Sequence, residues 1–93
     1  MKILVIDDDQ AMTELLTLLL KPASSSIIAA YSGPQGVEMA RTEKPDLITL
    51  DLMMPDMSGW EVCKAIRQFS STPILILSAL DSPGLVATAL DAG

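Results

Sequence analysis

Acidic side chains follow two apolar stretches of the sequence at the points where those stretches end. The run Asp7–Asp9 comes directly after Ile3–Ile6, and Asp51 comes directly after Leu47–Leu50. If both stretches are buried parallel strands, their carboxylates meet at the carboxyl end of one sheet, where open α/β sheets bind ligands. Crowded carboxylates raise one another's pKa unless a cation neutralises them. Hard oxygen ligands suit Mg²⁺, the usual partner of a phosphoryl group. The cluster therefore indicates metal-assisted phosphate chemistry.

The composition fits one small domain and excludes several other classes of function. The chain has 93 residues, 49% of them hydrophobic, and a net charge of −6, which argues against direct contact with nucleic acid or with an anionic membrane surface. No apolar run approaches the roughly 20 residues of a membrane-spanning helix, and the N-terminus lacks the pattern of a signal peptide. Cys63 is the single cysteine, and there is no histidine. We therefore expect a cytoplasmic protein without disulfides or histidine-based catalysis.

The elements that must position the carboxylates alternate along the chain. Short apolar runs and helical stretches follow one another, which is typical of a parallel sheet with crossover helices. Asp9 is expected to cap the first helix rather than to bind metal. Capping-box patterns begin at Ser32 and Ser58, and Ser82 with Pro83 is expected to start a last helix. The predicted strands are 2–6, 27–30, 46–50 and 74–77, and the predicted helices are 10–20, 33–43, 59–69 and 82–90, a (βα)₄ arrangement.

The sequence resembles the receiver domain of bacterial two-component response regulators. The resemblance is carried by Asp7 and Asp8 after the first strand and by the stretch 51–59, Asp-Leu-Met-Met-Pro-Asp-Met-Ser-Gly, after the third. The stretch 73–79, Pro-Ile-Leu-Ile-Leu-Ser-Ala, also fits. The resemblance covers essentially the whole chain. The resemblance implies an α/β, flavodoxin-like three-layer fold with a parallel sheet in the strand order 2-1-3-4.

The resemblance also implies a role for each residue of the acidic cluster. Asp51 would be the phosphoacceptor and would share a Mg²⁺ ion with Asp8, which would bind it directly, and with Asp7, which would bind it through water. The backbone carbonyl of Met53 would be a further metal ligand.

Two residues after the fourth strand have implied roles on the phosphoryl group. The hydroxyl of Ser78 would bond a phosphoryl oxygen, and the small side chain of Ala79 would leave room for that group. The implied donor is a sensor histidine kinase, so the chain would be a signalling module whose own chemistry is limited to self-phosphotransfer and autodephosphorylation.

The chain also departs from the family pattern. Complete receivers continue with a fifth strand, which ends in Lys-Pro, and a fifth helix, and neither follows here. We therefore expect an incomplete receiver domain over residues 1–93 that binds Mg²⁺ but accepts phosphate less readily. The strand 74–77 would be left as an edge, which predicts a homodimer, a domain-swapped oligomer or another way of shielding that strand.

Two other functions are compatible with the sequence. An incomplete receiver could serve purely as an oligomerisation or interaction unit. A Mg²⁺-dependent phosphohydrolase of the haloacid-dehalogenase type would also use an aspartyl-phosphate and places Asp-x-Asp after its first strand. Asp7–Asp9 satisfies that pattern only trivially, and the chain has no cap domain.

Overall fold

The sheet determines where the acidic residues come together. The computed structural model describes residues 1–23, 26–52, 54–55, 57–78 and 86–90. Five strands form one sheet in the order β2-β1-β3-β4-β5, in which the first four are parallel. The predicted order 2-1-3-4 is therefore confirmed. The strands are β1 (Lys2–Ile6), β2 (Ser26–Ala30), β3 (Leu47–Asp51), β4 (Ile74–Ser78) and β5 (Val86–Leu90).

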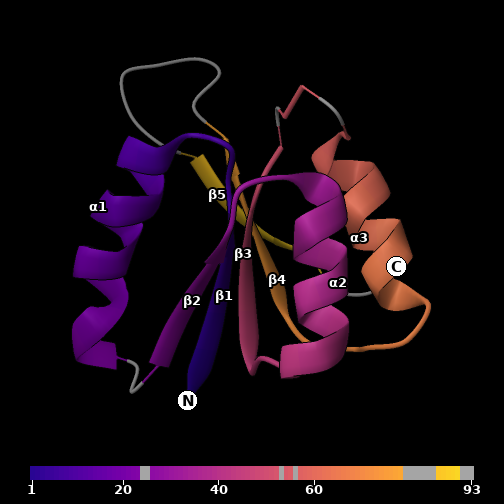
Figure 1. Cartoon of the computed structure of the whole chain (residues 1–93), viewed down its shortest axis with the longest axis horizontal. Coiled ribbons are helices and arrows are strands. Elements are labelled where there is room, and N and C mark those ends of the chain that lie inside the picture. The colour runs from indigo at the N-terminus through magenta and orange to yellow at the C-terminus, as the bar shows by residue number, and fades with distance from the viewer. Residues whose placement is uncertain (24–25, 53, 56, 79–85, 91–93) are drawn as a thin grey trace.

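Three α-helices in the described part of the chain cover the two faces of this sheet. Figure 1 shows α1 on one face and α2 and α3 on the other, which gives the three-layer arrangement expected from the sequence. The helices are α1 (Gln10–Leu20), α2 (Gly33–Glu43) and α3 (Gly59–Arg67), and a short 3₁₀ helix, η1 (Lys21–Ala23), follows α1. Their predicted starts are confirmed, while α3 ends two residues earlier than predicted. None of the described helices is long and apolar enough to cross a membrane.

The helices begin at the polar residues that the sequence indicated. The Asp9 side chain accepts hydrogen bonds from the amides of Ala11 (2.9 Å) and Met12 (3.3 Å), so its predicted capping role is confirmed. Ser58 and Glu61 form a reciprocal capping box at the start of α3. At α2, Ser32 accepts from the amide of Gln35, but the Gln35 side chain accepts from Tyr31 rather than from Ser32. The capping box predicted at Ser32 is therefore only half formed.

The central strands β1 and β3 are buried on both faces, as continuous apolar runs in parallel sheets normally are. Alternate residues of β1 point to opposite sides: Leu4 and Ile6 pack with the cluster under α2 and α3, while Ile3 and Val5 pack toward α1. All four side chains are almost fully inaccessible to water. This double burial holds the strand ends, and the residues that follow them, in fixed positions.

The predicted last helix is wrong. Residues Val86–Leu90 form β5, which runs antiparallel to β4 with Ser78 opposite Val86 and Ile74 opposite Leu90. A lone β4 would leave its backbone N–H and C=O groups unpaired on one side, and an antiparallel strand satisfies them. Such pairing outweighs helix propensity in a stretch too short to form a stable helix by itself. Since β5 pairs with β4, the predicted route to a dimer through an exposed edge of β4 is closed, and the alternative of a shielded strand applies.

Candidate functional site

Three carboxylates converge at the carboxyl end of the parallel strands. One oxygen each from Asp7, Asp8 and Asp51 lies within 4.8 Å of the others. The register explains the convergence, because Ile6 of β1 lies opposite Leu50 of β3, and the acidic residues follow at once. The sequence-based expectation that these segments meet is therefore confirmed by the geometry.

Asp7 is the buried member of the group. Only 5% of its surface is exposed, its amide donates to the carbonyl of Ala30 at 3.0 Å, and its Oδ1 accepts from the amide of Asp9 at 2.9 Å. Burial raises the pKa of Asp7 to about 6. The Asp9 hydrogen bond works against that rise, and the negative charges of Asp51, Asp8 and Asp9 add to it. This carboxylate is thus held where a nearby cation would stabilise its charged form.

The other two carboxylates lead from the interior toward solvent. Asp51 is half-buried at the end of β3, and Asp8 is exposed. Behind Asp51, the amide of Leu52 donates to the carbonyl of Leu77 in β4 at 3.3 Å, which anchors the start of the loop. Three converging oxygen ligands, one of them on a buried carboxylate with a raised pKa, fit a small hard cation such as Mg²⁺.

Asp9 does not belong to this group of ligands. Its carboxylate is used at the start of α1, and its carbonyl accepts from the Thr13 hydroxyl at 3.0 Å. The same hydroxyl lies 3.5 Å from the carbonyl of Asp7. Thr13 therefore ties the acidic loop to α1, a role that the sequence analysis missed. A buried threonine one turn into a helix, on the side of the preceding loop, is the signal that could have revealed it.

The remaining predicted site residues are described only in part. Ser78 is the last residue of β4 and follows Leu77, which lies opposite Asp51, so its backbone reaches the same end of the sheet. Met53 and Ala79 lie outside the described residues. Their roles, and that of the Ser78 hydroxyl, stay predictions.

Most of the basic residues lie away from this end of the sheet. All six lysines and arginines are among the described residues, and five of them lie where strands begin or helices end: Lys2, Lys21, Arg41, Lys44 and Arg67. These positions are at the amino end of the parallel strands. Lys64 is exposed in the middle of α3. Arg67 is half-buried, and its Nη1 donates to the carbonyls of Ser70 (3.2 Å) and Thr72 (2.7 Å).

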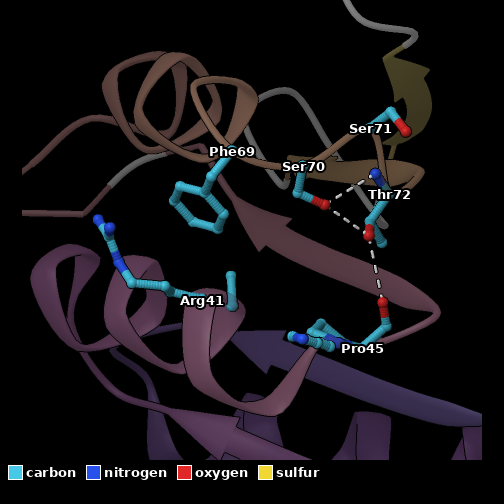
Figure 2. A pocket seen from close by; sticks show the side chains of 8 residues that line it. Arg41, Pro45, Phe69, Ser70, Ser71 and Thr72 are labelled. Atoms are coloured by element: carbon cyan, nitrogen blue, oxygen red, sulfur yellow. Dashed lines mark hydrogen bonds between the residues drawn. The ribbon is translucent and has the colours of Figure 1, made fainter.

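A hollow of about 550 Å³ lies at this opposite end of the sheet. Figure 2 shows Arg41 beside the ring of Phe69, with the guanidinium carbon 4.7 Å from the ring centroid. The hydroxyls of Ser70 and Thr72 are 2.8 Å apart, and that of Thr72 donates to the carbonyl of Pro45 at 3.2 Å. These polar groups satisfy one another and hold the turns before β3 and β4. The hollow therefore fits a structural junction, remote from the carboxylates.

Comparison with known proteins agrees with this arrangement. Residues 3–93 match the family described as the response regulator receiver domain. The alkaline phosphatase synthesis transcriptional regulatory protein PhoP of Bacillus subtilis is 46% identical over 81 residues, which are 86% of this chain and 34% of that protein. The response regulator MprA of Mycobacterium avium is 40% identical over 94 residues, covering 100% of this chain and 41% of MprA. The chain thus spans about two fifths or less of the length of these relatives.

Solved structures give the same result. The chemotaxis protein CheY4 of Vibrio cholerae superimposes with a TM-score of 0.78 at 33% identity, over 88% of this chain and 71% of CheY4. The receiver domain of the Francisella response regulator 1452 has a TM-score of 0.78 at 34% identity, over 87% of this chain and 68% of that one. The flavodoxin-like fold implied by the resemblance is confirmed. The chain belongs to the response regulator receiver domain family, the signalling modules of two-component systems.

Proposed function

We propose that this domain accepts a phosphoryl group on Asp51 from a sensor histidine kinase, with Mg²⁺ held by Asp7, Asp8 and Asp51. The observation that supports the proposal best is the convergence of the three carboxylates within 4.8 Å at the carboxyl end of a receiver sheet. In the reaction, a carboxylate oxygen of Asp51 bonds to phosphorus, and the phosphorus–nitrogen bond of the donor imidazole breaks. The donor nitrogen takes up a proton.

The three carboxylates have different parts in this proposal. Asp51 is half-buried at the end of a rigid strand, where its oxygen is held in place but reachable by a donor. Asp7 and Asp8 complete the oxygen ligands, one from the interior and one from the solvent side. When bound, Mg²⁺ would offset the repulsion between the carboxylate and the anionic phosphoryl group. The family resemblance supports the proposal that the Met53 carbonyl, the Ser78 hydroxyl and the small side chain of Ala79 belong to the same pocket.

The distribution of basic residues bears on the rate of this reaction. Phosphoryl transfer depends on positioning and on stabilisation of charge at the equatorial oxygens. None of the six basic residues lies at the end of the sheet where the carboxylates converge. We therefore propose that this domain accepts phosphate slowly. We expect a smaller effect on its Mg²⁺ affinity, because the carboxylates of Asp7, Asp8 and Asp51 converge.

The proposed partners follow from the same site and from the charge of the chain. The sensor histidine kinase is the donor, and the reaction takes place in the cytoplasm. The net charge of −6 argues that this domain makes no direct contact with nucleic acid, although one similar protein, MtrA, is named a DNA-binding response regulator. Neither the phosphohydrolase nor the pure interaction unit is favoured by a particular observation.

The test is phosphorylation by a small donor. The protein is incubated with Mg²⁺ and acetyl phosphate and examined by intact-mass spectrometry, and we expect one added phosphoryl group that is lost in Asp51→Asn and after chelation of the metal. Asp46→Asn, which changes a carboxylate at the other end of the sheet, is the matched control and should accept phosphate normally. Phosphorylation that persists in Asp51→Asn would contradict the proposal.

A further inference from the structure

The first turn of α2 lies against both acidic segments of the site. Gly33 and Gly36 are buried, three residues apart on one side of the helix. Gly36 abuts Ile6, the residue before Asp7, and Gly33 abuts Met57, in the loop that follows Asp51. Neither glycine has a left-handed backbone, so conformational freedom does not explain why both positions lack a side chain. Close approach of the helix does.

The contact at Gly33 involves atoms that cannot turn away. A Cβ atom built on Gly33 would lie 2.6 Å from the Cβ of Met57 and 3.0 Å from its Sδ. Rotation of the Met57 side chain moves Sδ but leaves its Cβ in place, since Cβ is fixed by the backbone. A methyl group at position 33 would therefore displace the loop itself or the start of α2. The contact at Gly36 differs, because the atoms it meets are side-chain carbons of Ile6.

The loop braced by this contact is closed at its base beside Asp51. The amide of Gly59 donates to the carbonyl of Leu52 at 3.0 Å. A Cβ on Gly59 would lie 2.8 Å from the Cα of Leu52 and 2.9 Å from the carbonyl oxygen of Asp51. The two sides of the loop thus touch directly at its base. A displacement of Met57 that moves Gly59 would therefore also move Leu52 and Asp51.

We propose that Gly33 is a positioning residue for Asp51, acting through Met57 and through Gly59, which closes against Leu52 and Asp51. The absence of a side chain lets α2 support the loop at the distance where the base of the loop closes. The consequence for metal binding and phosphorylation rests on the function proposed above, whereas the consequence for loop geometry does not. In helices, replacing Gly by Ala is ordinarily favourable, so a loss caused by Gly33→Ala would come from the contact.

The experiment compares Gly33→Ala with a fold control of similar size. Ile66→Val removes one methylene from the fully buried side of α3, at a distance from the loop. Amide hydrogen exchange by NMR reports the Gly59–Leu52 hydrogen bond, and Ile48, whose amide donates to Pro73 at 3.0 Å, serves as the internal reference. We expect Gly33→Ala to lose protection at Gly59 and not at Ile48, and Ile66→Val to retain both.

Metal affinity supplies the second readout, through the fluorescence of Trp60 in the first turn of α3. Residues that orient metal ligands without touching the metal typically change affinity about 10-fold to 100-fold, and we expect a loss of Mg²⁺ affinity in that range for Gly33→Ala. In a protein that already carries Met57→Gly, Gly33→Ala should cause no further loss of affinity. In a protein that carries Met57→Ala, Gly33→Ala should still lower the affinity, because alanine retains the Cβ that causes the overlap.

The outcomes separate the two proposals. Unchanged Gly59 protection in Gly33→Ala, equal losses in Ile66→Val, or rescue by Met57→Ala as complete as by Met57→Gly would overturn the positioning role. If the unaltered protein binds no Mg²⁺, the proposed function fails, while the Gly59 amide still decides whether Gly33 positions the loop.

Discussion

Burial and the neighbouring negative charges both act on the carboxylate of Asp7. It is 5% exposed, and burial together with the neighbouring carboxylates raises its pKa from 3.8 to about 6. The folded protein therefore binds this proton more tightly than the unfolded chain does. Asp7 lowers the stability of the fold progressively as pH rises from about 4 to about 6, and the full penalty applies above that range.

Removing this charge should stabilise the metal-free protein. Since one pKa unit corresponds to about 1.4 kcal/mol, the penalty at pH 7.5 is about 3 kcal/mol. Asp7→Asn keeps an oxygen that can accept the hydrogen bond from Asp9, so we expect a free energy of unfolding about 2–3 kcal/mol higher than that of the unaltered protein. Urea denaturation in a chelator measures it, and the difference should shrink toward zero near pH 4.

Asp46→Asn is the control for this experiment. Asp46 is exposed, and its carboxylate accepts from the amide of Lys2 at 2.8 Å, a bond that an asparagine oxygen can retain. A surface change of this kind should stay within about 0.5 kcal/mol at every pH. A stabilisation by Asp7→Asn that does not vary with pH would show that titration of this carboxyl is not its cause.

Thr49 carries a buried hydroxyl whose hydrogen-bonding capacity is unused. The side chain is 2% exposed in the middle of β3, opposite Val5 and Leu75, and its Oγ1 has no hydrogen-bond partner among the described residues. Valine has nearly the same shape without the polar atom. We expect Thr49→Val to raise the free energy of unfolding by about 1–2 kcal/mol, the cost of an unsatisfied buried polar group.

The same substitution at Thr13 should have the opposite sign. Its hydroxyl donates to the Asp9 carbonyl at 3.0 Å, and Thr13 as a residue is as buried as Thr49. Thr13→Val should lower the free energy of unfolding by about 1 kcal/mol. Chemical denaturation of both variants provides the measurement, and destabilisation by Thr49→Val would mean that this hydroxyl is satisfied after all.

At the scale of elements, the start of α3 depends on one serine. Ser58 accepts from the amide of Glu61 at 3.2 Å, and its own amide donates to the Glu61 carboxylate at 3.3 Å. Loss of an N-cap typically costs about 1 kcal/mol, and we expect that destabilisation for Ser58→Ala in thermal or urea unfolding. Ser71→Ala, at an exposed loop position, is the comparison and should be near neutral. Equal effects of the two changes would argue against the capping role.

The sequence predicts some elements well and others not at all. For α1, the capping residue Asp9 marks the start, and Pro22, which has no amide hydrogen for a continuing helix, lies just beyond the end. For residues 86–90, the sequence Val-Ala-Thr-Ala-Leu suits a helix or a strand, and only the unpaired side of β4 selects the strand. A partner distant in sequence decides that choice, so local patterns cannot reveal it.

The candidate site also has some features that the sequence predicts and others that it does not. Asp7 and Asp51 were predictable because parallel neighbouring strands end together. The support of the loop at Met57 by Gly33 was not, because it depends on the distance between a helix and a loop 24 positions apart in the chain. Periodicity identifies which face of a helix is buried. It does not give the distance of closest approach.

At the scale of the whole molecule, the three site carboxylates and most of the basic residues lie at opposite ends of the parallel strands. The three carboxylates meet at the carboxyl end of the parallel strands, and five of the six basic residues lie at the amino end. Two of these basic residues form ion pairs with glutamates of α2, Lys2 with Glu43 and Arg41 with Glu38. A cation bound between the three carboxylates would offset their mutual repulsion.

This separation predicts strong stabilisation of the fold by Mg²⁺. A ligand that binds the folded state alone, at one hundred times its dissociation constant, adds about 2.7 kcal/mol to the free energy of unfolding. For a domain of this size, that raises the thermal midpoint by roughly 10–20 °C. Calorimetry over a range of Mg²⁺ concentrations measures the rise, which should be largely lost in Asp51→Asn. KCl at matched ionic strength screens the repulsion without bridging the carboxylates. It should therefore produce a much smaller rise, and equal effects of the two salts would mean that the carboxylates do not act together as a metal site.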